Sequence, residues 1–177
     1  MFEGKLVRLA AVRRDDLALY TRWFSDPELL WFIAPQVLRP ASYDDEVDWY
    51  EAMRKDKDQF TFGIHTIAED RLIGNCSLGI QSWRNRAALF GIAIGDKAYW
   101  GRGYGTEATH LLMGYAFGEL NLNRVELEVY AFNTRAIRSY EKVGFVLEGT
   151  RRQAIFRDGV YHDAHIMSLL REDFPLA

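Results

Sequence analysis

The chain has 177 residues, and at about 150 residues per domain this length predicts a single domain spanning 1–177. Its 22 Lys and Arg residues and 25 Asp and Glu residues leave a net charge of −3 with 49% apolar residues, which is typical of a globular protein and disfavours broad nucleic-acid binding. The single cysteine, Cys76, excludes an internal disulfide and a cysteine-rich zinc site.

The distribution of charge also bears on location. The longest stretch free of Asp, Glu, Lys and Arg runs from Leu72 to Trp83, well below the roughly 18–20 apolar residues of a membrane-spanning helix. The N-terminus, from Met1 to Leu6, has no basic region followed by an apolar run and a small-residue cleavage site. We therefore expect a cytoplasmic protein with no membrane among its partners.

The N-terminal segment predicts a strand and then a helix. Residues 5–10 are expected to form the strand, and residues 15–24 carry apolar side chains at helical spacing. The tripeptide Ser25-Asp26-Pro27 is expected to end this helix. The apolar segment 31–40 is punctuated by prolines and is predicted to be a partly buried loop.

A second helix is expected to begin at Ser42, because its hydroxyl and the carboxylate of Asp45 can form a capping box. Beyond this helix the apolar period changes to two. Strands are predicted at 60–67, 72–81 and 87–94, joined by short polar turns. Such closely spaced strands favour an antiparallel meander.

The second half predicts two more helices between strands. Residues 103–120 carry one apolar stripe at helical spacing, and 124–130 alternate as a strand does. Asn133 can cap a further helix that Gly144 ends, and two last strands flank the tight turn at Asp158-Gly159. The order predicts an α/β (α+β) fold, a mixed, mostly antiparallel sheet of about six or seven strands with helices on both faces.

A glycine-rich segment, Trp100 to Thr106, lies between a strand and the start of the long helix. The first N–H groups of a helix lack intrahelical partners, and glycines let a phosphate approach them closely. Arg102 adds a positive charge. The segment therefore predicts a phosphate or pyrophosphate cradle, with a plain helix-entry turn as the simpler alternative.

Two other phosphate motifs are weighed against this segment. Residues 103–108 fit the loose G-x-G-x-x-G/A dinucleotide pattern, but six residues, Gly95 to Trp100, separate the strand from the glycines. The chain before them also lacks parallel strand-helix units, which disfavours a nicotinamide or flavin site. A Walker loop is excluded because no Gly-Lys-Ser/Thr follows.

Two segments together resemble the GNAT acetyltransferase superfamily. Gly101 to Ala108 is similar to its acyl-CoA pyrophosphate loop, Q/R-x-x-G-x-G/A, with Trp100 where the family usually has Gln or Arg. Asn133 to Phe145 resembles the signature N-x-x-A-x-x-x-Y-x-K-x-G-F. The ends of the chain, 4–9 and 158–163, are similar to the branch with ribosomal-protein-alanine N-acetyltransferases and spermidine acetyltransferases.

The resemblance implies a GNAT-like fold in which acetyl-CoA, the cosubstrate, is held between two splayed strands while an amine attacks its thioester. Asn133 would help to secure the CoA arm, and Tyr140 would be the general acid for the departing thiolate. No metal is implied. Backbone groups for the pantetheine amides would come from Ile92, Ala93 and Ile94. The residues expected to hold the pyrophosphate are Arg102, Gly103, Tyr104, Gly105 and Thr106.

Three glutamates are candidates for the general base that would take the proton of the amine. Glu126 and Glu128 share one face of a predicted strand, and Glu107 lies in the first turns of the long helix. We expect Glu128 to be the catalytic one. Each of the three can also be a structural or solvated carboxylate.

The acceptor is left open between a protein N-terminal α-amine and a polyamine or other small amine. An α-amine, with a pKa of about 7.7–8.0, needs less help from a base than an amine with a pKa of about 10.4. A noncatalytic acyl-CoA-binding regulatory domain is the alternative function. A homodimer is one assembly left open.

Three further groups have two interpretations each. The acidic residues of 44–51 could attract a polycation or form a solvated helix face. Aromatic side chains could line an acceptor pocket or pack in the core; they are Trp31, Phe32 and Trp49. His162 and His165 are expected on opposite faces of a strand, which makes them a poor metal pair.

Overall fold

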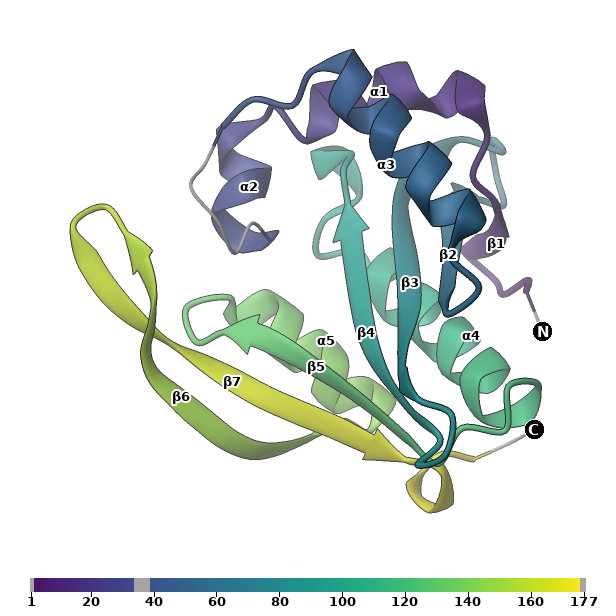
Figure 1. The fold of residues 1–177 in the computed structure, drawn as a ribbon, viewed down its shortest axis with the longest axis vertical. Coiled ribbons are helices and arrows are strands. Elements are labelled where there is room, and N and C mark those ends of the chain that lie inside the picture. Colours follow the sequence, from purple (N-terminus) through teal and green to yellow (C-terminus); the bar gives the residue numbers. More distant parts are fainter. Residues whose placement is uncertain (1, 34–38, 176–177) are drawn as a thin grey trace.

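A seven-stranded sheet forms the centre of the protein (Figure 1), for which a computed structural model describes residues 2–33 and 39–175. Its strands lie in the order β1-β2-β3-β4-β5-β7-β6. The strands are β1 (Val7–Ala11), β2 (Gln59–Thr66), β3 (Leu72–Ser82), β4 (Ala87–Ile94), β5 (Arg124–Tyr130), β6 (Val146–Arg157) and β7 (Val160–Leu170). Neighbouring strands are antiparallel except β4 and β5, which are parallel. The predicted mixed, mostly antiparallel sheet is confirmed.

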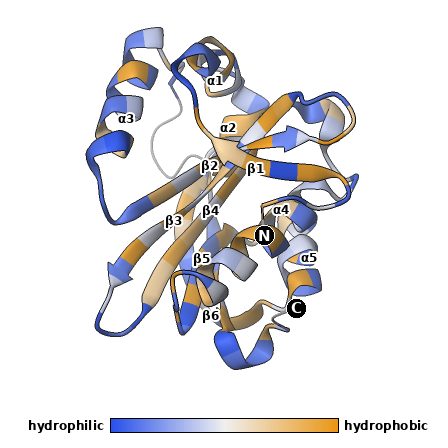
Figure 2. Ribbon diagram, turned by 90° about the vertical axis from the view of Figure 1, so that its right-hand side faces the viewer, coloured by the Kyte–Doolittle hydropathy of each residue, from blue (hydrophilic) through white to orange (hydrophobic). Residues whose placement is uncertain are grey.

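Helices cover both faces of this sheet. They are α1 (Leu17–Trp23), α2 (Pro27–Ile33), α3 (Tyr43–Lys55), α4 (Tyr104–Gly118) and α5 (Thr134–Val143). Figures 1 and 2 show α1 and α3 on one side of the strands and α4 and α5 on the other. Among the described helices, none has the length and apolar character required to cross a bilayer.

The main core lies between the sheet and the helices α4 and α5. The apolar stripe expected over 103–120 is present, since Ala108, Leu112 and Ala116 of α4 are fully buried, and Met113 and Phe117 beside them are also fully buried against the strands. Burying a side chain of this size contributes about 1.5–3 kcal/mol. Figure 2 shows the corresponding apolar character along the central strands. The packing fixes α4, and therefore its N-terminus, relative to β4.

Local capping signals place several boundaries where the sequence predicts them. The Ser42 hydroxyl accepts a hydrogen bond from the Asp45 N–H at 3.1 Å, and the Asp45 carboxylate accepts one from the Ser42 N–H at 2.8 Å. Gly144 ends α5 with a φ of 112°. Asp158 and Gly159 both have positive φ, as a type I′ hairpin turn requires.

The helix α2 corrects the prediction of a loop over 31–40. Pro27 occupies the first helical position, where its missing N–H costs nothing. The side chain of Asp26 accepts a hydrogen bond from the Glu28 N–H at 2.9 Å. Ser25-Asp26-Pro27 therefore separates α1 from α2 and starts the second of them. Residues 34–38 of the expected loop lie outside the described residues.

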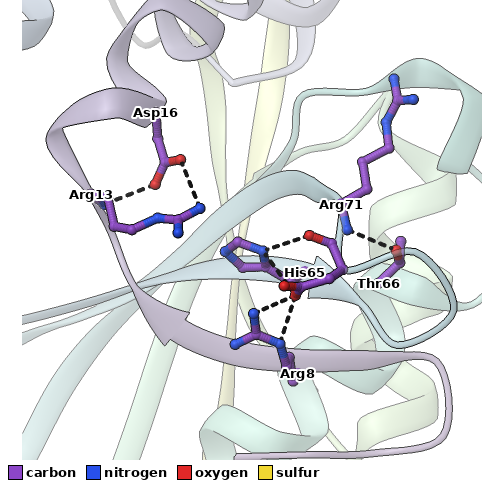
Figure 3. A network of polar contacts seen from close by, with 7 residues as sticks. Arg8, Arg13, Asp16, His65, Thr66 and Arg71 are labelled. Atoms are coloured by element: carbon purple, nitrogen blue, oxygen red, sulfur yellow. Dashed lines mark hydrogen bonds and ion pairs between the residues drawn. The ribbon is translucent and has the colours of Figure 1, made fainter.

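Polar contacts join the edge strand β1 to the turn between β2 and β3 (Figure 3). Arg8 of β1 forms an ion pair with Asp70 in that turn. The carbonyl oxygen of Asp70 lies 3.3 Å from Nδ1 of His65, whose side chain is buried. The hydroxyl of Thr66 accepts a hydrogen bond from the Arg71 N–H at 3.2 Å. This network holds the edge strand and the turn together.

Candidate active site

The strands β4 and β5 are paired only where they begin. Their parallel register joins 87–89 to 124–126, and beyond these residues the strands diverge (Figure 1). The strand β4 remains paired with β3 as far as Ile94. One edge of β4, at residues 92–94, therefore faces the gap without a neighbouring strand.

A cavity of about 640 Å³ occupies the region where the strands separate. Its wall comes from α2, β4, the glycine-rich loop, the start of α4, β5 and α5. The sequence-predicted site residues that line it are Ile92, Ala93, Ile94, Gly103, Gly105, Thr106, Glu128, Asn133 and Tyr140. Of the predicted site residues, Arg102 and Tyr104 do not belong to this wall.

The N-terminus of α4 is open. Gly103 precedes the helix with a φ of 90°, a conformation that favours glycine, and it provides no side-chain cap. The first hydrogen bond of the helix is from the Glu107 N–H to the Gly103 carbonyl at 3.0 Å, and the N–H groups of 103–106 make none to the described residues. Aligned, unpaired N–H groups at a helix start favour an anion. The geometry therefore fits a diphosphate.

Arg102 and Tyr104 lie elsewhere than the sequence suggests. The Arg102 guanidinium donates a hydrogen bond to the Ala98 carbonyl at 3.2 Å and lies 5.8 Å from the ring centres of Tyr99 and Tyr104. The Tyr104 ring packs against Tyr99 with a centroid distance of 5.0 Å. Tyr104 can therefore serve the cradle through its N–H group, whereas the charge of Arg102 lies outside the cavity wall.

Trp100 takes a position that the loop motif does not anticipate. Its indole N–H donates a hydrogen bond to the Ile94 carbonyl at 2.6 Å, so one of the expected pantetheine-binding carbonyls already has a partner. The guanidinium of Arg135 lies 3.9 Å from the centre of the Trp100 ring and 5.4 Å from that of Phe32. A cation thus reaches the loop from α5.

Tyr140 packs between β4 and the end of α5. Its ring meets Phe90 edge-on at a centroid distance of 6.0 Å, and Phe145 lies 5.9 Å away. Burial raises the pKa of Tyr140 to about 12. The hydroxyl makes no hydrogen bond to the described residues and stays protonated at neutral pH, so it is a donor available at the cavity.

Asn133 both starts α5 and lines the cavity. Its side-chain oxygen accepts a hydrogen bond from the Ala136 N–H at 3.3 Å. The side-chain NH₂ makes no hydrogen bond within the described part of the chain and is left as a donor. Six residues farther along, the Ser139 hydroxyl shares a 2.7 Å hydrogen bond with Thr106. This bond joins the start of α4 to α5.

The three candidate bases have different surroundings. Glu128 lines the cavity and forms an ion pair with Arg151 of β6. Glu126 lies outside the cavity wall and pairs with Arg124 at 3.1 Å. Glu107 is structural, because its carboxylate accepts hydrogen bonds at 2.6–2.9 Å from the N–H groups of Lys5, Leu6 and Val7. Only Glu128 of the three is placed to meet a substrate.

The aromatic candidates divide between the cavity and the core. Phe32 lines the cavity beside two further α2 side chains, Leu29 and Ile33. Trp31 packs on Phe132 with a centroid distance of 5.7 Å. Trp49 belongs to a second core cluster, which α1 and α3 share. The short helix α2, which the sequence analysis missed, therefore supplies an apolar wall.

The acidic residues and histidines do not gather at this site. No acidic residue of 44–51 lines the cavity, and Glu46 is buried instead. His162 packs on Phe132, whereas His165 shares a hydrogen bond with Thr150. Over residues 2–33 and 39–175, no group of three His, Cys, Asp or Glu side chains could hold a metal ion.

Sequence reasoning also missed three basic residues of the cavity wall. Arg135, Arg138 and Lys142 of α5 line the same cavity as the open end of α4. Their spacing of three and then four residues places them on one helix face. That spacing was the available signal, because the helix itself was predicted from Asn133 to Gly144.

Comparisons with known proteins agree with this geometry. A family model described as an acetyltransferase (GNAT) domain matches residues 7–146. The "Probable N-acetyltransferase YjcK" of Bacillus subtilis is 39% identical over 128 residues, covering 71% of this chain and 69% of that protein. The spermidine N(1)-acetyltransferase of Vibrio cholerae is 28% identical over 94% of each chain.

A solved structure extends the likeness to the whole fold. The crystal structure of spermidine N-acetyltransferase from Vibrio cholerae, in complex with CoA and spermine, has a TM-score of 0.87 and 25% identity to this chain. The likeness covers 96% of this chain and 98% of that one. With a family match over most of its length, the chain belongs to the GNAT acetyltransferase family and is an acetyltransferase.

Proposed function

We propose that this protein transfers the acetyl group of acetyl-CoA, its cosubstrate, to a primary amine by direct attack of the amine on the thioester. One observation carries the proposal. The unpaired N–H groups at the start of α4 open into the same cavity as Tyr140, in the gap between β4 and β5. One cavity therefore contains both a site for the diphosphate and a hydrogen-bond donor for the sulfur of the same cosubstrate.

The donor half of the site has three parts. The N–H groups of 103–106 would hold the diphosphate, since a helix N-terminus stabilises negative charge. The free edge of β4 at Ile92 and Ala93 would bind the pantetheine amides as an added strand does. The unpartnered NH₂ of Asn133 would donate to a pantetheine carbonyl. Ile94 contributes less, because its carbonyl already accepts from Trp100.

The role of Tyr140 follows from its pKa. As the C–N bond forms and the C–S bond breaks, negative charge develops on sulfur. Burial raises the pKa of Tyr140 to about 12, above the pKa of about 8.5 of a free thiol, so complete proton transfer from the tyrosine to the leaving thiolate is unfavourable. We therefore assign Tyr140 hydrogen-bond donation to the leaving sulfur rather than complete proton transfer.

The acceptor must lose a proton, and its class decides how much help it needs. An α-amine is already about a tenth neutral at pH 7, whereas a polyamine nitrogen is neutral in only about one molecule in 2,500. Among the described residues that line the cavity, Glu128 is the only carboxylate, and Arg151 already pairs with it. The α2 wall is apolar. These features favour an acceptor with one amine, such as a protein N-terminal α-amine, which is the first candidate.

A polyamine is the second candidate. Its support is the likeness to spermidine acetyltransferases over most of the chain. A panel of N-terminal peptides, polyamines, amino sugars and amino acids, with thiol release from acetyl-CoA as the readout, separates the two. Faster acetylation of peptides than of spermidine supports the first candidate, and the reverse order supports the second. CoA binding without transfer to any amine would contradict the proposed enzyme and favour a regulatory CoA-binding domain.

A further inference from the structure

The helix α5 carries a cationic stripe, defined here as Arg135, Arg138 and Lys142. All three line the cavity, and none forms a hydrogen bond or ion pair with the described residues. The spacing of three and then four residues brings them to one face of the helix. The stripe therefore presents three unpaired cations to the cavity.

Helix stability does not account for the two arginines of this stripe. Arg135 lies in the first turn of α5, where a positive charge opposes the helix dipole, and no acidic residue occupies that turn. Arg138 and Lys142 are like charges four residues apart, an arrangement that destabilises a helix. Lys142 lies in the last turn, where the helix dipole favours a cation, so the positions of Arg135 and Arg138 are the ones that call for an explanation outside the helix.

The stripe is also partly preorganised. Trp100 is held by its hydrogen bond to the Ile94 carbonyl, and its ring carries the Arg135 guanidinium at 3.9 Å. Stacking on an aromatic face leaves the N–H edge of a guanidinium free to donate. Arg135 therefore has a fixed platform and free donors, which suits a phosphate group.

The stripe adjoins the open end of α4. Ser139, next to Arg138 in the chain, shares a hydrogen bond with Thr106 of α4. A diphosphate at the N–H groups of 103–106 would account for one anionic part of CoA. The remaining anionic part of that molecule is the phosphomonoester on the ribose 3′-oxygen.

We propose that the stripe of Arg135, Arg138 and Lys142 binds the 3′-phosphate of CoA and makes the protein discriminate CoA from dephospho-CoA. This inference rests on the proposed function, because it requires CoA in the cavity. It adds a second phosphate site, built from side chains on α5, to the backbone cradle at α4.

The test measures the dissociation constants of CoA and dephospho-CoA by calorimetry. The wild-type protein should bind CoA at least about 10-fold more tightly, since charge-assisted hydrogen bonds to a phosphate strengthen binding by at least this factor. The triple variant Arg135→Gln, Arg138→Gln, Lys142→Gln should lose this preference while its affinity for dephospho-CoA stays nearly unchanged. The three side chains are solvent-exposed, so the variant should keep its thermal unfolding midpoint.

A matched control removes the same charge elsewhere. Lys57, Arg84 and Arg152 are exposed, lie outside the cavity wall and make no hydrogen bond or ion pair with the described residues, so their triple Gln variant should keep the wild-type preference. Equal affinity of the wild type for both ligands, retained preference in the stripe variant, or equal loss in the control would each overturn the inference. A wild-type protein that binds neither ligand would instead refute the proposed function.

Discussion

The helices α3 and α4 begin in opposite ways. At α3, the Ser42 hydroxyl accepts the Asp45 N–H of the first turn, and the Asp45 carboxylate accepts the N–H of Ser42 just before the helix. At α4, Gly103 supplies no side chain, and the N–H groups of 103–106 make no hydrogen bond to the described residues. A closed helix end stabilises the fold, whereas an open one keeps its donors for a ligand. The contrast supports the proposed ligand site at α4 and a structural role for the cap of α3.

The largest effect is expected where the open end is filled. Gly105→Val places a branched side chain at the diphosphate cradle, yet its Cβ would lie 3.5 Å from Ile94, an ordinary contact. We expect CoA affinity to fall about 100-fold or more, because charge-assisted hydrogen bonds are lost. Calorimetry measures this, with the thermal midpoint as a check on folding. Undiminished CoA binding would place the cradle elsewhere.

A second substitution tests the role of Tyr140, which lines the same cavity as the open end of α4. Tyr140→Phe removes the donor to the leaving sulfur and should lower kcat about 100-fold while CoA affinity is nearly retained. Steady-state kinetics and a CoA titration on the same preparation separate the two quantities. An unchanged kcat would remove Tyr140 from the mechanism.

A smaller effect is expected at the closed helix. Burial and the charge of Asp45 raise the pKa of Glu46 to about 7. The unfolded chain releases this proton near pH 4.3, whereas the folded protein retains it up to about pH 7. The free energy of unfolding therefore decreases as pH rises from about 4.3 to about 7. Glu46→Gln should therefore add about 2 kcal/mol of stability at pH 8 and little at pH 4. Urea unfolding at both pH values measures the difference; an equal effect at both would contradict it.

The smallest effect concerns the cap itself. Ser42→Ala leaves an N–H group of α3 without its partner and should cost about 1 kcal/mol of unfolding free energy. CoA affinity should not change, because α3 does not line the cavity. A loss of CoA affinity with Ser42→Ala as large as that with Gly105→Val would erase the contrast between the two helix ends.

Much of the fold could be predicted because its signals are local. The capping box at Ser42, the positive φ at Gly144 and the Asp158-Gly159 turn each depend on a few adjacent residues. The helix α2 was missed for a related reason. Ser25-Asp26-Pro27 was interpreted only as a stop, although Asp before Pro is also a helix start.

The candidate site was predicted in part. The resemblance to the GNAT motifs assigned the glycine loop, the edge of β4, Asn133 and Tyr140 to one CoA site, and in the structure they line one cavity. Arg102 was assigned to the cradle by proximity in sequence, yet its side chain turns to the Ala98 carbonyl. Arg135 lies beyond the next strand and still reaches the loop through Trp100. The spacing of residues in the sequence could not predict these side-chain contacts.

The sequence by itself determined the elements, their order and the chemical groups available to them, because periodicity, caps and turns act over a few residues. The resemblance implied two splayed strands, but only the tertiary structure decided that β4 and β5 part after 87–89, that α2 closes one side of the cavity, and that basic residues of α5 line the same cavity as the start of α4. These outcomes depend on how whole elements pack. Packing sums contacts between residues far apart in the chain, and no local pattern encodes that sum.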